Sequence, residues 1–108
     1  MPTPAETNSQ LITKLMSATE QGRIDWQKTA VPKQYTASFG GKWTVLIDLG
    51  EADDERPFYW FTLNDSDGQE ILRIDHDSRL DSLFELARRH ALKVNEAIAD
   101  VLKELDKP

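Results

Sequence analysis

The chain has 108 residues, a formal net charge of −6 and no cysteine. Its 39% hydrophobic and 30% charged residues are typical of a folded domain rather than of a disordered chain. The missing cysteines exclude disulfides and Cys-based zinc sites. The acidic balance argues against nucleic acids and anionic membranes as partners. We expect one domain over residues 1–108, which is long enough to bury a core without a metal or disulfide.

The N-terminus and the hydropathy bear on location. The first residues, with Pro2 and Pro4, have neither the basic nor the apolar segment of a signal peptide. No apolar run approaches the ~18 residues of a membrane span. A cysteine-free chain also fits a reducing compartment. We therefore predict a cytoplasmic protein without a membrane partner, and we expect residues 1–6 to form a flexible arm.

Residues 7–22 have the pattern of an amphipathic helix. Thr7 and Gln10 match a capping box, in which two side chains satisfy backbone N–H groups that the helix leaves free. Gly22 can take the left-handed conformation that commonly ends a helix. The pattern predicts a helix over residues 8–21, with apolar positions Leu11, Ile12, Leu15 and Met16.

A β-hairpin follows. Two runs of alternating apolar and polar residues, 35–39 and 43–49, flank Gly40 and Gly41. Both glycines accept the positive φ of a tight turn, so the pattern predicts two antiparallel strands. Residues 24–26 before them form either an edge strand or an extended connector.

Two more strands complete the predicted sheet. Residues 58–63 and 70–74 are separated by a segment rich in turn-forming residues, 64–68. The acidic segment 50–57 is predicted to be a solvated loop, with Glu51, Asp53, Asp54 and Glu55.

The last third of the chain is helical. Asp77 or Ser78 can cap a first helix, and Asn95 can cap a second. The apolar positions of the two segments are Leu80, Leu83, Phe84, Ala87 and Ala91, then Ile98, Val101, Leu102 and Leu105. We predict helices over residues 79–91 and 95–106, with one kinked helix as the alternative. The fold class is thus α+β, with an N-terminal helix, a four-stranded antiparallel meander and two C-terminal helices.

No motif in the chain predicts a catalytic residue, a cofactor or a metal site. The segment 65–68 resembles a calcium loop, but its register places Leu63 and Ile74 at ligand positions. Asp75, His76 and Asp77 are too close in sequence to converge on one ion. There is no nucleophile elbow and no phosphate-binding loop. We predict that the protein is not an enzyme.

A strand followed by two helices, residues 73–105, resembles a ribbon-helix-helix DNA-binding unit. Arg73 would be its basic strand reader, and Arg88, Arg89 and Lys93 form a candidate basic patch. The resemblance implies a dimer that reads the major groove with strand side chains. A nucleic-acid-binding regulator is therefore the alternative function.

The whole chain is also similar to small bacterial or phage-associated cytosolic proteins. The segments that carry this similarity are residues 19–26, 38–41 and 79–89. The similarity implies a prokaryotic cytosolic origin. It implies no activity and no site residue.

The predicted sheet has two unequal faces. One face is apolar, and we expect helix 8–21 and the C-terminal helices to cover it around Trp43, Val45 and Ile47. The third strand carries aromatic residues on both faces, so Leu46, Phe58 and Trp60 fall on the opposite one. They are either covered core or an exposed partner interface. We predict a small protein-binding or regulatory module that acts through this face, with a homodimer as one form of it.

Overall fold

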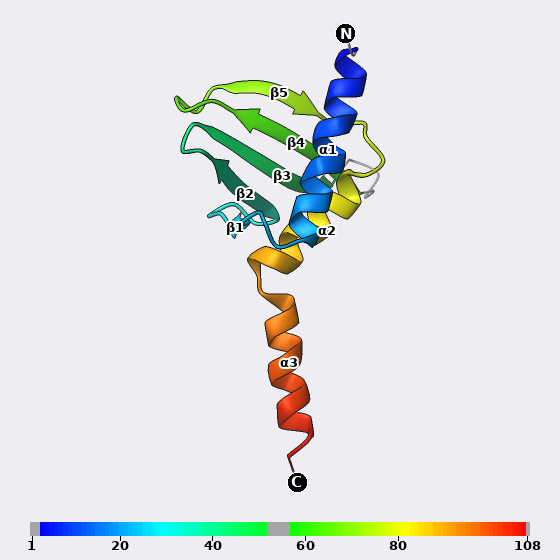
Figure 1. The fold of residues 1–108 in the computed structure, drawn as a ribbon, viewed down its shortest axis with the longest axis vertical. Helices are drawn as coiled ribbons and strands as arrows, with labels where there is room; N and C mark the ends of the chain where they lie inside the picture. The colour runs from blue at the N-terminus through cyan, green and yellow to red at the C-terminus, as the bar shows by residue number, and fades with distance from the viewer. Residues whose placement is uncertain (1–2, 52–56, 108) are drawn as a thin grey trace.

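A meandering antiparallel sheet forms the centre of the molecule, and two helices lie on one of its faces (Figure 1). The computed structural model describes residues 3–51 and 57–107. Adjacent strands along the chain are hydrogen-bonded neighbours in the sheet. The elements are α1 (Pro4–Glu20), β1 (Gln27–Lys28), β2 (Gln34–Phe39), β3 (Trp43–Glu51), β4 (Pro57–Asn64), β5 (Glu70–Ile74), α2 (Leu80–Ala91) and α3 (Val94–Leu105).

The predicted α+β class, with an N-terminal helix, an antiparallel sheet and two C-terminal helices, is confirmed, but the sheet has five strands rather than four. The additional strand is β1, in which Gln27 pairs with Thr36 and Lys28 with Tyr35. Two residues are too few for an alternating pattern to appear in the sequence. The connector before β1 buries Ile24 and Trp26.

Helix α1 begins earlier than predicted. Thr3, not Thr7, is its N-cap, and the Glu6 backbone N–H donates to Thr3 Oγ1 at 3.1 Å. Pro4 suits the first helical position because it has no N–H to leave unsatisfied. Residues 4–6 are therefore helical rather than part of a flexible arm, and residues 1–2 lie outside the described residues. At the other end Gly22 has the predicted positive φ, +71°.

The hairpin prediction is confirmed by Gly40 and Gly41, whose φ angles are +63° and +66°. Strands β3 and β4 are longer than predicted, because Glu51 pairs with Pro57 at the ends of the acidic segment. Of the predicted loop 50–57, residues 52–56 lie outside the described residues.

The core lies between the sheet and helices α1 and α2. The Phe84 ring of α2 contacts Tyr35 and Tyr59 of the sheet, with ring centroids 5.4 and 5.5 Å apart. Trp26 closes one end, where its Nε1–H donates to Thr19 Oγ1 at 2.9 Å. The buried apolar residues are Ile12, Leu15, Ile24, Trp26, Tyr35, Ala37, Val45, Ile47, Phe61, Leu80, Leu83, Phe84 and Ala87.

Two separate C-terminal helices form, as predicted. The chain breaks between them at Leu92 and Lys93, and Lys93 takes the left-handed conformation, φ +54°. The expectation that both helices cover the sheet is wrong for the second one. The turn at Lys93 directs α3 away from the body, so the molecule is elongated, 60 × 38 × 27 Å (Figure 1). No helix in the described part of the chain is long and apolar enough to cross a membrane.

Candidate interaction surfaces

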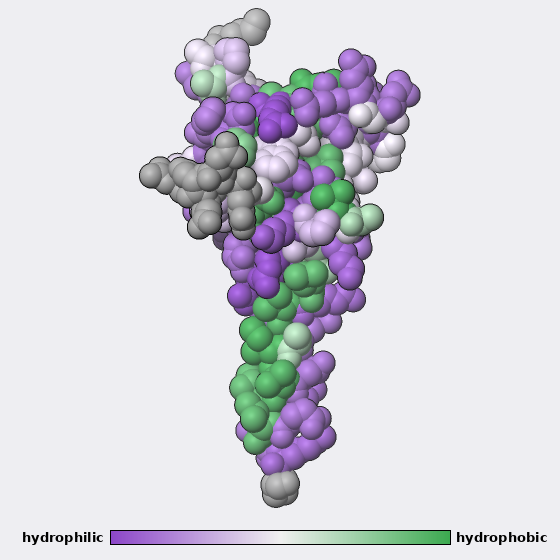
Figure 2. Space-filling model, turned by 180° about the vertical axis from the view of Figure 1, so that it is seen from behind, coloured by the Kyte–Doolittle hydropathy of each residue, from purple (hydrophilic) through white to green (hydrophobic). Residues whose placement is uncertain are grey.

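Helix α3 presents a row of apolar side chains to solvent. Their spacing of three and four residues places them on one side of the helix. Figure 2 shows this row as a continuous apolar strip along the projecting helix, with polar residues beside it. We call it the α3 stripe, and it consists of Val94, Ala97, Ile98, Val101, Leu102 and Leu105.

The exposure of the α3 stripe is unusual for a helix of this composition. Leu105 is 73% exposed, Val101 and Leu102 are 56% exposed each, and no residue of α3 is buried. Helices α1 and α2 bury their apolar positions against the sheet. A twelve-residue helix is marginal in water on its own, because most helical stability comes from packing of the apolar side. The α3 stripe is therefore a surface that lacks its packing partner among the described residues.

The predicted basic patch lies at the base of α3. Arg88 forms an ion pair with Glu85 at 3.2 Å, and Arg89 donates to Asn95 Oδ1 at 2.9 Å. Lys93 is exposed in the joint between the helices. The structure thus brings the three cations together within about one helical turn of the joint. A polar cleft of about 270 Å³ adjoins them, between residues 25–27 and 89–96.

The predicted partner residues Leu46, Phe58 and Trp60 lie on the sheet face opposite α1 and α2, and all three are half-buried. The Phe58 and Trp60 rings contact each other, with centroids 5.8 Å apart. Trp60 lies flat over Gly50, where an added Cβ would stand 2.8 Å from the ring. The Arg73 guanidinium packs on the Trp60 ring, with its central carbon 5.3 Å from the ring centroid. We call these residues the sheet-face cluster.

A buried carboxylate, that of Asp48, lies on the same sheet face as the sheet-face cluster. Asp48 pairs across the sheet with Trp60 and is only 6% exposed. Gln34 Nε2 donates to it at 2.8 Å, and the Gln34 oxygen accepts from Thr29 Oγ1 at 2.7 Å. Burial raises the pKa of Asp48, and the hydrogen bond from Gln34 offsets part of that effect. The Asp48 carboxylate is thus buried beside Trp60 of the cluster in the sheet register.

A second apolar surface lies beside α1. The groove has a volume of about 300 Å³ and an almost wholly apolar lining, with Trp43 38% and Ile71 50% exposed. It lies between α1, which contributes Leu11 and Leu15, and the sheet. We call it the hairpin groove, and it is lined by Leu11, Leu15, Phe39, Trp43, Val45, Leu63 and Ile71.

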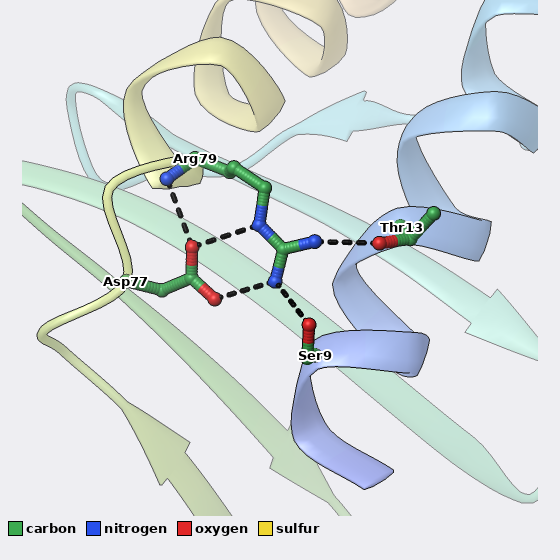
Figure 3. Close-up of polar contacts among 4 residues, drawn as sticks. All are labelled: Ser9, Thr13, Asp77 and Arg79. Carbon is green, nitrogen blue, oxygen red and sulfur yellow. Dashed lines mark hydrogen bonds and ion pairs between the residues drawn. The ribbon is translucent and has the colours of Figure 1, made fainter. Parts of the chain in front are cut away.

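Arg79, at the start of α2, makes polar contacts with α1 (Figure 3). Its guanidinium donates to Asp77 at 2.7 and 3.0 Å and reaches α1 at Ser9 Oγ, 3.1 Å, and Thr13 Oγ1, 2.5 Å. The N-cap of α2 is Arg79, not Asp77 or Ser78 as the sequence predicts, and the Asp77 carboxylate accepts from the Arg79 side chain and backbone N–H. The hydrogen bonds from Arg79 lower the pKa of Asp77. This arrangement fixes the start of α2 against α1.

The remaining candidates for metal or acid–base chemistry are engaged in local structure. Asp65 accepts from the backbone N–H groups of Asp67 and Gln69, at 3.0 and 2.9 Å, within the β4–β5 turn. Asp75 lies 3.4 Å from His76 and 3.7 Å from Arg73. Within residues 3–51 and 57–107, no three His, Asp or Glu side chains converge as metal ligands would.

The segment that resembles a ribbon-helix-helix unit is β5, α2 and α3. Its strand is the outer strand of the five-stranded sheet, and Arg73 packs on Trp60. Its second helix projects from the body. The comparisons with known proteins add nothing further: no family model, no curated protein and no solved structure matches the chain.

Proposed function

We propose that the protein is a small non-catalytic protein-binding module, and that the α3 stripe is its binding surface. The observation that supports this proposal is the exposure of Ile98, Val101, Leu102 and Leu105 on one side of a helix in which no residue is buried. Contiguous apolar patches of this kind mark interaction sites.

The attachment of α3 to the body and the spacing of its apolar residues support the same proposal. A packed body holds the base of α3 through the two-residue joint, so the helix is presented at a fixed point. Helices that bind partners use i, i+3, i+4, i+7 anchors, and Ile98, Val101, Leu102 and Leu105 follow this spacing. The composition without cysteine favours the cytoplasm as its location.

The sheet-face cluster is a weaker candidate for the main surface. Its residues are half-buried, and Trp60 packs on Gly50 and Arg73. These contacts occupy the aromatic side chains within the monomer. We therefore assign the partner interface to α3, and not to Leu46, Phe58 and Trp60 as the sequence predicts.

Site-specific photo-crosslinking in the expressing cells tests the proposal. A photoreactive residue replaces Leu102, in the α3 stripe, or Ala99, on the polar side of the same helix. We expect protein adducts from position 102 and few from position 99. Equal or absent adducts at both positions would show that the stripe is not a protein-binding surface. Adduct mass then identifies the partner as a second copy or another chain.

A further inference from the structure

We propose that the partner of the α3 stripe is the α3 stripe of a second copy, and that the two helices pair in opposite directions. This inference rests on the proposed function and names its partner. Three observations carry it: the register of the apolar side chains, the distribution of charge along the chain, and the area that the pairing buries.

The register fits a short two-helix coiled coil. Ile98 and Leu105 are seven residues apart, as are Val94 and Val101, so the two pairs occupy the a and d positions of a heptad repeat. In an antiparallel pair with its two-fold axis between residues 99 and 100, Val94 faces Leu105 and Ile98 faces Val101 of the other copy. This gives four apolar layers, two that pair Val94 with Leu105 and two that pair Ile98 with Val101. Ala97 and Leu102 flank them.

Charge favours this direction over the parallel one. Arg89 and Lys93 place two positive charges at the base of each α3, beside Arg88, whose charge is paired with Glu85. A parallel pair would bring both bases together. In the antiparallel pair each base instead meets the C-terminal end of the other helix, which is the negative end of its dipole. Asp106 of one copy then lies level with Lys93 of the other.

The net charge of the whole chain acts in the same sense. Each copy carries −6. Antiparallel helices hold the two bodies at opposite ends of the pair, where their mutual repulsion is weaker. Parallel helices would hold the bodies side by side.

The buried area suits a weak, reversible dimer. Pairing two stripes of this length buries on the order of 1,000 Å² in total, which is the lower limit for a specific interface. We therefore expect dissociation constants in the micromolar range.

Cysteine crosslinking tests the direction directly, because the native chain contains no cysteine. Val94→Cys and Leu105→Cys are prepared as separate proteins. Each is treated, alone and mixed with the other, with a short bis-maleimide whose reach matches the ~8–10 Å between packed helices. In the antiparallel pair like cysteines are about 16 Å apart along the axis, whereas unlike ones share a layer.

We expect crosslinked dimers in the mixture and little crosslinking of either variant alone. Crosslinking of each variant with itself would show a parallel pair and overturn the inference. A dimeric mass without any crosslink would also overturn it, since α3 would then seat elsewhere, for example in the hairpin groove. A monomer in every sample would overturn the second copy as partner while leaving position 102 crosslinking in cells as a separate test of the proposed function. Circular dichroism of both variants checks that the body is folded.

Discussion

At the scale of single residues, two charged side chains, Asp48 and Arg79, are held by hydrogen bonds to other segments of the chain. Asp48 is buried, and its charge is stabilised by the Gln34 amide and by Arg73. Arg79 is partly exposed, yet it connects Asp77 with two hydroxyls of α1. Neither arrangement can be read from the sequence, because both depend on contacts between segments far apart in the chain.

Replacing Asp48 with Asn should raise stability at neutral pH. The pKa of Asp48 is raised in the folded protein, so folding favours the protonated form. Its contribution is therefore most favourable below pH ~3.8 and is lost as the pH rises through the folded pKa. Asn keeps an oxygen to accept from Gln34 without the buried charge. We expect a gain of up to about 1 kcal/mol at pH 7 that disappears below about pH 4, measured by urea unfolding. A loss of stability at pH 7 would show that the carboxylate is better solvated than the structure indicates.

Replacing Arg79 with Ala should destabilise the protein by about 1–2 kcal/mol at pH 7, because hydrogen bonds to charged partners are lost. Lys at this position should recover only part of the loss, since it cannot make the forked contact with Asp77. The lowered pKa of Asp77 gives the sign of the pH effect. The stabilisation is present above pH ~3.8 and is lost as the pH falls through the folded pKa. Urea titrations at pH 7 and about pH 2 measure this, and an equal Arg79→Ala effect at both values would contradict the role of the ion pair.

At the scale of elements, the sequence predicts what local chemistry determines. The hairpin at Gly40 and Gly41 and the left-handed Gly22 are specified by residues within a few positions of one another. Strand β1 has only two residues and forms because β2 offers it an edge, so no local pattern announces it. The start of α1 differs from the prediction for another reason. Thr3 and Thr7 are each followed three residues later by a residue that completes a capping box, Glu6 and Gln10. Pro4 favours Thr3 as the N-cap, because proline suits the first helical position.

Helices α2 and α3 show where the candidate site could not be predicted. Both have twelve residues and an apolar stripe of similar quality, yet α2 buries Leu83 and Phe84 while α3 exposes Val101 and Leu102. Periodicity shows which side of a helix is apolar and says nothing of what covers it. The left-handed turn at Lys93 makes the difference, and Lys is not a residue whose sequence context signals that conformation.

The hairpin turn provides a test at the same scale. Gly41→Val should destabilise the protein by about 1–3 kcal/mol, because a β-branched residue is strained at φ +66°. An added Cβ would meet no heavy atom within 4 Å, so the cost is one of backbone conformation alone. Gly41→Asn is the matched control and should be tolerated better, since Asn enters the left-handed region more readily. Thermal melts decide the matter, and identical melting temperatures for all three proteins would contradict the turn geometry.

At the scale of the whole molecule, the packed body and the projecting helix α3 differ in how they bury apolar side chains. The body buries its apolar residues on one face of the sheet and shields the other with the sheet-face cluster. The projecting α3 leaves its apolar side uncovered, as Figure 2 shows. We propose that α3 is the binding element and that the body holds its base, where the charges of Arg89 and Lys93 favour an antiparallel pair.

The most direct measurement of this account is the molar mass in solution of three proteins by light scattering: the native chain, Ile98→Asp and Ala99→Asp. The two variants add the same charge to adjacent positions, one in the α3 stripe and one outside it. At about 100 μM, where a micromolar dimer is populated, the native chain and Ala99→Asp should have twice the monomer mass of 12.3 kDa. Ile98→Asp should remain a monomer with an unchanged melting transition, since α3 contributes no buried residue. A native chain that is monomeric at this concentration, or a dimer that Ile98→Asp leaves intact, would contradict the pairing of α3.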